Sequence, residues 1–508
     1  MSQTAVSDQK AINHIAALDL GSNSFHLVVA RIVAQDVQIL HQLKLPVQIA
    51  DGLDDDLILS DAAMARGLDA LKVMAESLRG FEPDQVRIVG TYTLRRARNA
   101  RAFAKAARKI LPYPVEIISG MEEARLIYLG VAHTNHHDGR RMVVDIGGGS
   151  TEIALGEGFN PDYLLSLPMG CVTYTRRFFE NGRIRAKNFS RAIREARQEI
   201  EPVVLALTGQ DWQHCLGSSG TVRTIVDLAQ RLGTHTPAGH VTLSDLHSLS
   251  RYLIDAGHVD KLDFENLSET RRPVLPAGLA IMIGVFESLD IRVLEYSAGA
   301  LREGVIWEME EQLEHKDIRE RTAASLVTRY VIDEEQARRV EETTLSLYHK
   351  VKKDWEIDSA EFENILTWAA RLHEVGLQIN SKSVQKHSAY ILASVAMPGF
   401  NQETQALLAT LVRFQRKKIR PEEVEEFLLF ESPDVCKLIA LLRLGVLLNF
   451  KRQDELLPAK LRISASGESY TLNLGRRWLA GKPVFQTSLE REQNQISALG
   501  LTLNVTKN

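Results

Sequence analysis

The stretch MVVDIGGGST, residues 142–151, is the part of the sequence that decides the expected fold. Its apolar start is typical of a short buried strand, and Asp145 stands at the end of that strand. The three glycines at 147–149 allow the backbone to turn where side chains would clash, so amide groups can face a ligand. Ser150 and the second carboxylate, Glu152, follow. A carboxylate beside such a turn suits a metal-bridged phosphate, although a lone glycine turn would also fit a tight β-hairpin.

The same pattern occurs earlier in the chain, in IAALDLGSNS at residues 15–24. An apolar strand again ends at an aspartate, Asp19, and is followed by a glycine turn with hydroxyl and amide side chains. Two copies of this pattern indicate an internal duplication. We therefore expect two similar domains that face each other, with a ligand rich in phosphate groups between the two loops.

The composition is that of an ordinary globular protein. The chain has 508 residues, 44% of them hydrophobic and 25% charged, with a formal net charge of −4. This length predicts about three or four domains. The three cysteines lie far apart, which argues against a disulfide framework and fits a reducing cytosol. The first ten residues do not resemble a signal peptide. The apolar run nearest in length to a membrane span, residues 438–450, is too short to be one.

Two further loops support a phosphate site. Residues 217–223, GSSGTVR, and residues 297–304, SAGALREG, each follow a short predicted strand and open a helix. The free amide groups and the positive dipole end of such a helix favour an anion. Each loop alone is weak support, but together they strengthen the interpretation.

One arginine and one glutamate stand where an α/β sheet binds its ligands. The predicted strand 86–90 leads into a basic helix over 94–111, and Arg95 lies at the start of that helix. An arginine there can form a fork onto phosphate oxygens. In SGMEEAR, Ser119 and Glu122 have the spacing of a capping box. Glu123 has no capping role, so it could take a proton from water or complement the helix dipole; the local sequence leaves both open.

From residue 316 to about 449 the sequence has helical periodicity almost throughout, which predicts a separate all-helical domain. A strand pair around Gly467 and a small C-terminal subdomain are expected after it. The predicted helices cover residues 318–330, 334–355, 359–375, 386–396, 402–414, 421–429 and 435–449. In the first half of the chain, a long helix over 187–207 is also expected.

Two features of the helical region bear on function. His373 and Glu374 resemble the paired ligands of metal-dependent HD phosphohydrolases, but the set is incomplete, so a scaffold without the metal site is expected. Residues 378–420 hold seven basic side chains, Lys417 and Lys418 among them, against one acid. They could be neutralised by the acids that follow, or they could form a track for a long polyanion. Few aromatic residues lie among them, which disfavours nucleic-acid binding by base stacking.

The paired loops resemble the phosphate loops of the actin, Hsp70 and sugar-kinase superfamily. DLGSNSFHLVVAR, ISGMEEARLIYLGV, VVDIGGGSTE, GSSGT and SAGALREGV together resemble the exopolyphosphatase/guanosine pentaphosphate phosphohydrolase (Ppx/GppA) family. The resemblance continues through LHEVGLQIN, HSAYIL and LLRLGVLLN, so it covers almost the whole chain. The branch it resembles most is that of the long, four-domain bacterial exopolyphosphatases.

This resemblance implies a fold and a reaction. The fold is α/β, with two actin-like (ribonuclease H-like) domains, residues 1–127 and 128–312, forming a cleft. A degenerate HD-like helical domain, residues 313–452, and a small C-terminal α+β subdomain, residues 453–508, follow. The reaction is processive hydrolysis of the terminal phosphate of inorganic polyphosphate with Mg²⁺, and often K⁺ as activator. A cytoplasmic homodimer is implied, with peripheral membrane association left open.

The resemblance also assigns roles to residues. The catalytic carboxylate is Glu123, which decides between the two roles left open above, and Asp145 and Glu152 are the acids near the metal. The arginine that contacts phosphate is Arg95, and the basic track adds Lys417 and Lys418. The phosphate loops comprise Gly21, Ser22, Asn23, Ser24, Gly147, Gly148, Gly149, Ser150, Gly217, Ser218, Ser219, Gly220 and Thr221.

Three other functions compete with the exopolyphosphatase prediction. The first is a guanosine pentaphosphate 5′-phosphohydrolase, which would use the same site. The second is an actin-like ATPase or sugar kinase, for which no separate carbohydrate motif is seen. The third is a sensing module without catalysis, which would be expected to lack Glu123 or a metal carboxylate.

Overall fold

The chain was analysed as a computed structural model that describes residues 13–33, 36–135, 137–233, 236–264, 267–313, 318–454, 457 and 461–506. The tail predicted for residues 1–13 lies almost wholly outside these residues. The chain divides into two compact units, Met1–Lys316 and Asp317–Asn508.

The first unit begins with a five-stranded sheet in the order β3-β2-β1-β4-β5. The first three strands form an antiparallel meander, and β4 and β5 add to it in parallel. Helix α1 (Asp61–Ser77) connects β3 to β4. The strands are β1 (Asn13–Leu20), β2 (Ser24–Val33), β3 (Asp36–Pro46), β4 (Val86–Gly90) and β5 (Val115–Ile117).

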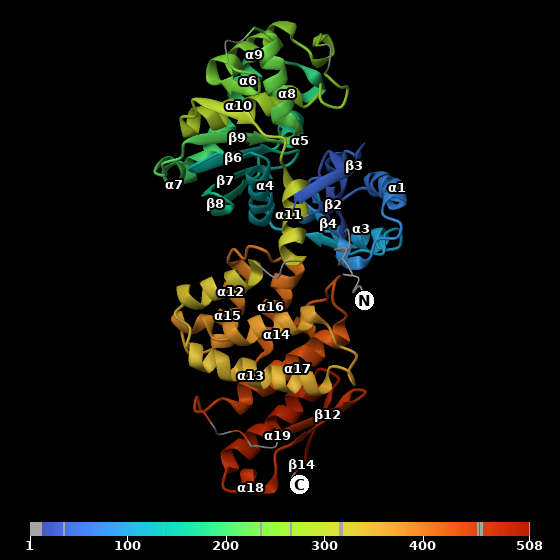
Figure 1. Ribbon diagram of the computed structural model, residues 1–508, viewed down its shortest axis with the longest axis vertical. Coiled ribbons are helices and arrows are strands. Elements are labelled where there is room, and N and C mark those ends of the chain that lie inside the picture. The colour runs from blue at the N-terminus through green and yellow to red at the C-terminus, as the bar shows by residue number, and fades with distance from the viewer. Residues whose placement is uncertain are drawn as a thin grey trace, which may run out of the picture. The chain divides into compact units, whose positions relative to one another are not determined.

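The second sheet repeats this topology. Its order is β10-β11-β9-β6-β7-β8, so without β10 it has the same meander followed by two parallel strands; β6 to β9 are labelled in Figure 1. This repetition confirms the predicted pair of similar α/β halves. The strands are β6 (Arg140–Ile146), β7 (Thr151–Glu157), β8 (Asn160–Leu167), β9 (His214–Ser218), β10 (His240–Thr242) and β11 (Val293–Tyr296).

Two helices, α4 (Gly120–Thr134) and α11 (Leu301–Leu313), link the two sheets. Helix α4 packs against β6, β7 and β8, whereas α11 packs against β1 and β2, and the two helices contact each other (Figure 1). Side chains from both sheets and both helices form one apolar cluster. The predicted domain boundary at 127/128 falls inside α4, while the two sheets themselves follow the predicted halves.

Two predicted helices of the first unit are interrupted. The basic helix expected over 94–111 is two helices, α2 (Tyr92–Arg96) and α3 (Ala100–Ala107). The break lies where the Asn99 amide pairs with the backbone of Leu59, at 2.9 and 2.8 Å. The helix expected over 187–207 ends at Ile200 as α6 (Ala186–Ile200), because Pro202 follows, and a short α7 (Val204–Thr208) comes after it.

The remaining helices of the first unit cover the second sheet. They are α5 (Cys171–Phe178), α8 (Ser219–Arg231), α9 (Leu243–Ala256) and α10 (Leu275–Leu289). Helix α10 is buried along almost its whole length and packs against α5, α6, α8 and α9. In the part of the chain that the structure describes, no helix is long and apolar enough to cross a membrane.

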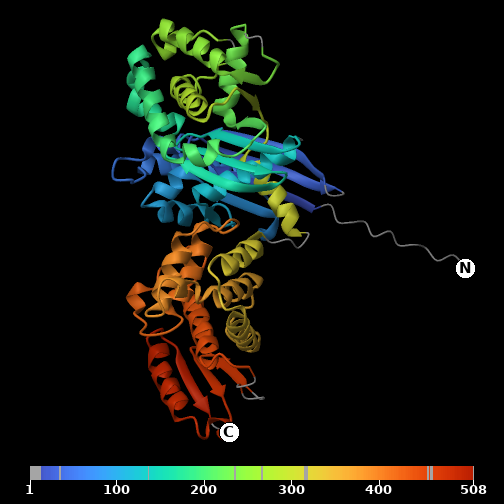
Figure 2. The same cartoon turned by 90° about the vertical axis from the view of Figure 1, so that its left-hand side faces the viewer.

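The second unit is a helical array followed by a small sheet. One apolar cluster contains side chains of both parts, so the regions predicted as 313–452 and 453–508 share a core. Helix α19 lies along one face of the sheet; both the helix and the sheet are drawn in red in Figure 2. The elements are α12 (Ile318–Arg329), α13 (Glu334–Val351), α14 (Ala360–Leu372), α15 (Val384–Ser394), α16 (Gln402–Phe414), α17 (Ser432–Leu448), β12 (Arg462–Ser466), β13 (Ser469–Asn473), α18 (Arg476–Leu479), α19 (Pro483–Ser497) and β14 (Thr502–Thr506).

The prediction of a helix over residues 421–429 is wrong. Only a single 3-10 turn, Pro421–Glu423, forms there. The Glu403 carboxylate instead accepts hydrogen bonds from the backbone amides of Leu428 and Leu429, at 2.6 and 2.9 Å. This side-chain acceptor replaces the helical one, so the segment stays irregular.

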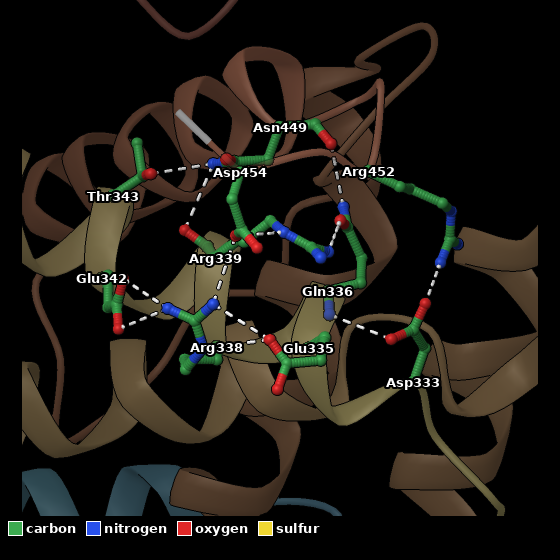
Figure 3. A network of polar contacts seen from close by, with 10 residues as sticks. All are labelled: Asp333, Glu335, Gln336, Arg338, Arg339, Glu342, Thr343, Asn449, Arg452 and Asp454. Atoms are coloured by element: carbon green, nitrogen blue, oxygen red, sulfur yellow. Dashed lines mark hydrogen bonds and ion pairs between the residues drawn. The ribbon is translucent and has the colours of Figure 1, made fainter. Parts of the chain in front are cut away.

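A polar network ties α13 to the end of α17 (Figure 3). Asn449 donates to Thr343 Oγ1 at 2.8 Å, and its carbonyl accepts from Gln336 at 3.0 Å. Beyond α17, Asp454 accepts from Arg339 at 2.8 Å. These contacts join helices that are far apart in the sequence.

Candidate active site

A cavity of about 430 Å³ opens between the loops of the two sheets. The loop after β1 and the loop after β6 meet there: a Cβ built on Gly148 would lie 2.9 Å from the Cβ of Ser22, and one built on Gly149 would overlap the Tyr92 ring. Only glycine allows this approach. The predicted loop residues Gly21, Ser22, Asn23, Ser24, Gly147, Gly148, Gly149, Ser150, Ser219, Gly220 and Thr221 all line the cavity.

Two aspartates stand at matching places in the two halves. Asp19 is near the end of β1 and Asp145 near the end of β6, and both line the cavity. Burial raises the pKa of Asp19 to about 7; Arg302 opposes the rise, and Glu123 and Asp145 add to it. Burial likewise raises the pKa of Asp145 to about 7, and Glu123 adds to the rise. The two carboxylates therefore favour a neighbouring positive charge.

Glu123 faces the same cavity from the first turn of α4. Its carboxylate accepts a hydrogen bond from Arg95 Nη1 at 3.1 Å, and the same nitrogen donates to the Ile118 carbonyl at 2.9 Å. Burial raises the pKa of Glu123, and Arg95 opposes the rise. The side chain is thus a buried carboxylate whose orientation is held by a cationic partner, Arg95. Arg95 does not line the cavity, so its observed contact is with Glu123.

Glu152 lies behind Asp145, as its direct cross-strand partner on β7. It is buried but does not line the cavity. Ser166 donates a hydrogen bond to its carboxylate at 2.7 Å. Burial raises the pKa of Glu152 well above its usual value, and the charges of Glu123 and Asp145 add to the rise.

Four basic side chains contribute to the cavity: Lys44, Arg223, Arg271 and Arg302. Arg271 Nη1 donates to Thr221 Oγ1 at 3.3 Å. Burial, with Arg271 and Arg302 nearby, lowers the pKa of Lys44 to about 8, although part of this side chain is exposed. These groups can neutralise several phosphate charges.

His26 is held among these cations. Its Nδ1 pairs with Arg302 Nη1, and its Nε2 lies 2.8 Å from Ser24 Oγ. Burial, followed by the charges of Arg302, Lys44 and Arg271, lowers the pKa of His26 to about 2. The ring is therefore neutral at physiological pH and positions its neighbours rather than binding an anion by charge.

The acidic side of the cavity has the chemistry that a divalent cation needs. Asp19 Oδ1 is buried and has no hydrogen-bond partner among the described residues. In the same part of the chain, no group of three or more His, Cys, Asp or Glu side chains forms a ready-made metal cage. Mg²⁺ is commonly held by one or two carboxylates, with water and phosphate oxygens completing its shell. Asp19 and Asp145 fit that mode.

Two predicted phosphate-binding residues have a different place. Gly217 and Ser218 belong to strand β9 and do not line the cavity. Ser218 Oγ donates to the Gly299 carbonyl at 2.8 Å. The strand continues two residues further than predicted and α8 begins at Ser219, so Ser219, Gly220 and Thr221 line the cavity from the first turn of that helix.

Of the two hydrogen bonds of the predicted capping box at the start of α4, the one accepted by the serine side chain is formed. Ser119 Oγ accepts from the Glu122 amide at 3.1 Å. The Glu122 carboxylate, however, accepts two hydrogen bonds from Arg125, at 2.8 and 2.7 Å. Glu122 is structural, as expected, but through this ion pair.

Sequence analysis did not assign Lys44, His26, Arg271 or Arg302 to the site. Arg302 lies within the fourth glycine loop segment, residues 297–304, which was a usable indication. Lys44 and His26 are directly opposite each other in the pairing of β2 with β3. Only the pairing of the two strands determines that these residues are neighbours. Arg271 lies in an irregular segment before α10, with no local pattern to identify it.

In the second unit, the HD-like pair is engaged in structural contacts. His373 is buried, with Nδ1 2.6 Å from the Ala370 carbonyl. Glu374 forms an ion pair with Arg452, a residue that also pairs with Asp333 in the network of Figure 3. These contacts give both side chains a packing role.

The basic stretch of the second unit is partly neutralised. Arg413 and Arg420 both pair with Glu423, at 2.8 Å each. Lys417 and Lys418 are exposed. Part of the basic stretch is thus neutralised by an acid that follows it in the sequence. A track for a long polyanion stays a prediction, which rests on the two exposed lysines.

The two sheets of matching topology, with paired glycine loops around a cavity lined by both carboxylates and cations, define an actin-like fold. The comparison with protein families gives the particular family. Residues 28–313 match the Ppx/GppA phosphatase family, and residues 318–493 match domain III of the Ppx/GppA phosphatases. The chain belongs to the Ppx/GppA phosphatase family, as the resemblance predicted.

Similar proteins span nearly the whole chain. The guanosine-5′-triphosphate,3′-diphosphate pyrophosphatase of Vibrio cholerae serotype O1 is 40% identical over 490 residues, which cover 96% of this chain and 97% of that protein. The enzyme of the same name from Vibrio parahaemolyticus is 39% identical, covering 97% of this chain and 98% of its own length.

Solved structures match more than half of the chain. The Aquifex aeolicus Ppx-GppA enzyme has a TM-score of 0.50 at 25% identity and covers 58% of this chain and 99% of its own. An exopolyphosphatase from Cytophaga hutchinsonii has a TM-score of 0.54 at 24% identity, covering 59% of this chain and 98% of its own. The latter shows a shared fold.

Proposed function

We propose that this protein hydrolyses the terminal 5′ phosphoanhydride bond of guanosine 5′-triphosphate,3′-diphosphate. The observation that carries the proposal is the cavity, where an oriented carboxylate, Glu123, faces two phosphate loops and a group of cations. The name shared by relatives that are 39–40% identical along nearly the whole chain favours this substrate over polyphosphate. The sequence analysis had placed the two substrates in the opposite order.

The chemistry follows from the positions of the side chains. Glu123 takes a proton from water, whose oxygen attacks the terminal phosphorus; the new O–P bond forms as the bond to the bridging oxygen breaks. The leaving group is the 5′-diphosphate end of the nucleotide, which carries the negative charge away as guanosine 5′-diphosphate,3′-diphosphate, and the attacked phosphorus is released as inorganic phosphate. Loop amides and Arg271 stabilise charge on the phosphate oxygens, and a preorganised donor of this kind contributes ~10²–10³-fold in rate. Arg95 holds Glu123 in place.

Mg²⁺ is the metal that we propose for this site. Asp19 and Asp145 would hold it, with Glu152 behind Asp145 supporting the arrangement. Bound there, it would neutralise charge on the phosphate oxygens. K⁺ as an activator and a homodimeric assembly stay predictions; light scattering would test the second.

A second candidate is the exopolyphosphatase reaction with the same residues. Its support is the exposed pair Lys417 and Lys418, which lie in a basic stretch suited to a long chain of phosphates. A guanosine substrate does not require such a stretch.

The test measures phosphate release from guanosine 5′-triphosphate,3′-diphosphate, long-chain polyphosphate and ATP in parallel, with Mg²⁺. Wild type is compared with Glu123→Gln and with Glu157→Gln, an exposed glutamate at the far end of β7. We expect turnover of the guanosine substrate to fall ~10²–10⁴-fold in Glu123→Gln and to stay near wild type in Glu157→Gln. Fast release from polyphosphate alone would support the second candidate, and ATP turnover alone would refute both.

A further inference from the structure

Glu308 is a buried carboxylate on α11 that the proposed chemistry does not use. It is 2% exposed and lies in the middle of the helix. Two arginines pair with it: Arg87 from β4 through Nη1, and Arg125 from α4 through Nη2. One side chain of α11 therefore connects a strand of the first sheet to the helix that carries Glu123.

The connection extends in two directions. Arg125 also forms a two-point ion pair with Glu122, at 2.8 and 2.7 Å. Arg87 also donates to Glu116 on β5, at 3.2 Å. Burial opposes the charge of Glu308, but Arg125 and Arg87 lower its pKa below the usual value, so it stays ionised. A buried network of this kind is weak support for stability in itself, whereas its geometry is well defined.

The network ends beside Glu123. Glu122 precedes it in the first turn of α4, where Ser119 Oγ accepts from the Glu122 amide and the Ser119 carbonyl accepts from the Glu123 amide, at 3.1 and 2.9 Å. The Glu122 side chain is held by Arg125, and the Glu123 side chain is held by Arg95. This turn is therefore fixed through both carboxylates.

Helix α11 is itself held close to α4. A Cβ built on Gly130 would lie 2.1 Å from the Ala300 carbonyl oxygen, and one built on Gly304 would lie 1.8 Å from the Leu126 carbonyl oxygen. The two helices thus pack backbone against backbone, which only glycine allows. At its cavity end, α11 presents Arg302. The same helix therefore contributes a cation to the cavity and, through Glu308, contacts the helix whose first turn carries Glu123.

We propose that Glu308 is a positioning residue for Glu123: through Arg125 and Glu122 it fixes the first turn of α4, so that the Glu123 carboxylate faces the attacking water. The inference rests on the proposed function, in which Glu123 is the base. A displacement of about 1 Å at such a group can cost ~10²-fold in rate.

The test is Glu308→Gln, which keeps the shape and removes the charge shared by the two arginines. We expect kcat to fall about 10-fold or more, with KM within about twofold of wild type because the cavity lining is unchanged. Glu492→Gln is the matched control: it removes the charge from another buried ion pair, with Arg443, in the second unit. Its kcat should stay near wild type. If Glu308→Gln does not fold, Arg125→Lys breaks the two-point pair with Glu122 and tests the same connection.

A double-mutant cycle separates the outcomes. In a Glu123→Ala background, Glu308→Gln should cause almost no further loss, because there is no base left to position. An equal loss in both backgrounds, or an unchanged kcat in Glu308→Gln while Glu123→Ala loses turnover, would overturn the positioning role and leave the proposed function standing. Turnover retained in Glu123→Ala would instead overturn the proposed function.

Discussion

Replacing Asp145 by asparagine should stabilise the metal-free protein while abolishing its activity. Burial raises the pKa of Asp145 to about 7, against 3.8 for the free side chain. Between these two values the unfolded chain binds fewer protons than the folded chain, so stability falls as the pH rises from about 4 to about 7, and stays low above it. At about 1.4 kcal/mol per pH unit, the difference between the two pKa values corresponds to a loss of at most about 4 kcal/mol in the free energy of unfolding at pH 8.

The assay is urea unfolding of wild type and Asp145→Asn in EDTA, at pH 5 and pH 8. The gain in free energy of unfolding should be about 2–3 kcal/mol larger at pH 8 than at pH 5. Any pH-independent cost of burying the amide cancels in that difference. Asp69→Asn is the control, because Asp69 is exposed and pairs with Lys72 on the surface. The comparison separates the effect of the buried site from that of the substitution itself.

Added Mg²⁺ should reverse the order of stability. In the proposed site the ion would bind the folded wild type through its carboxylates and stabilise it by mass action, whereas Asp145→Asn would lose one ligand. The reasoning would be refuted by an equal gain at both pH values, or by a variant that is less stable than wild type at pH 8 in EDTA.

Three further predictions test other parts of the molecule. Gly304→Ala should destabilise the protein by about 1–3 kcal/mol or more, because its Cβ would overlap the Leu126 carbonyl; an unchanged thermal unfolding midpoint would contradict the close packing of α4 and α11. Arg271→Met should raise KM about 10-fold or more, the value of a charge-assisted hydrogen bond, and steady-state kinetics with an unchanged KM would exclude a phosphate contact. Charge reversal at Lys417 and Lys418 should weaken long polyphosphate chains more than short ones in binding assays; equal effects at both lengths would return these lysines to a solvated surface.

Much of the fold could be predicted because its determinants are local. A glycine turn after an apolar strand depends on neighbouring residues, so both loops and both strand-end aspartates, Asp19 and Asp145, were found from the sequence. The repeat of that pattern predicted two similar halves, which the matching strand orders confirm. The proposed catalytic role of Glu123 rests on the family resemblance, because a helix-dipole role and a catalytic role fit the local sequence equally well.

The errors arose where distant residues compete with local propensity. The segment 421–429 has helical periodicity, but the Glu403 carboxylate takes its backbone donors. The basic helix breaks where the Arg98 amide donates to the Leu57 carbonyl, at 2.9 Å. In both cases a partner from another part of the chain satisfies the backbone in place of the helical hydrogen bond, and periodicity contains no information about that partner.

The sequence by itself determined the class of the protein, its paired glycine loops and its strand-end carboxylates, because each depends on a few adjacent residues. Only the tertiary structure decided which cations join them. Arg271 and Lys44 reach the cavity from segments with no motif, and Glu308 meets Arg87 and Arg125 only because α11 crosses α4 at two glycines. Strand register and helix packing bring such residues together, and these are properties of the whole folded unit rather than of any one stretch of the chain.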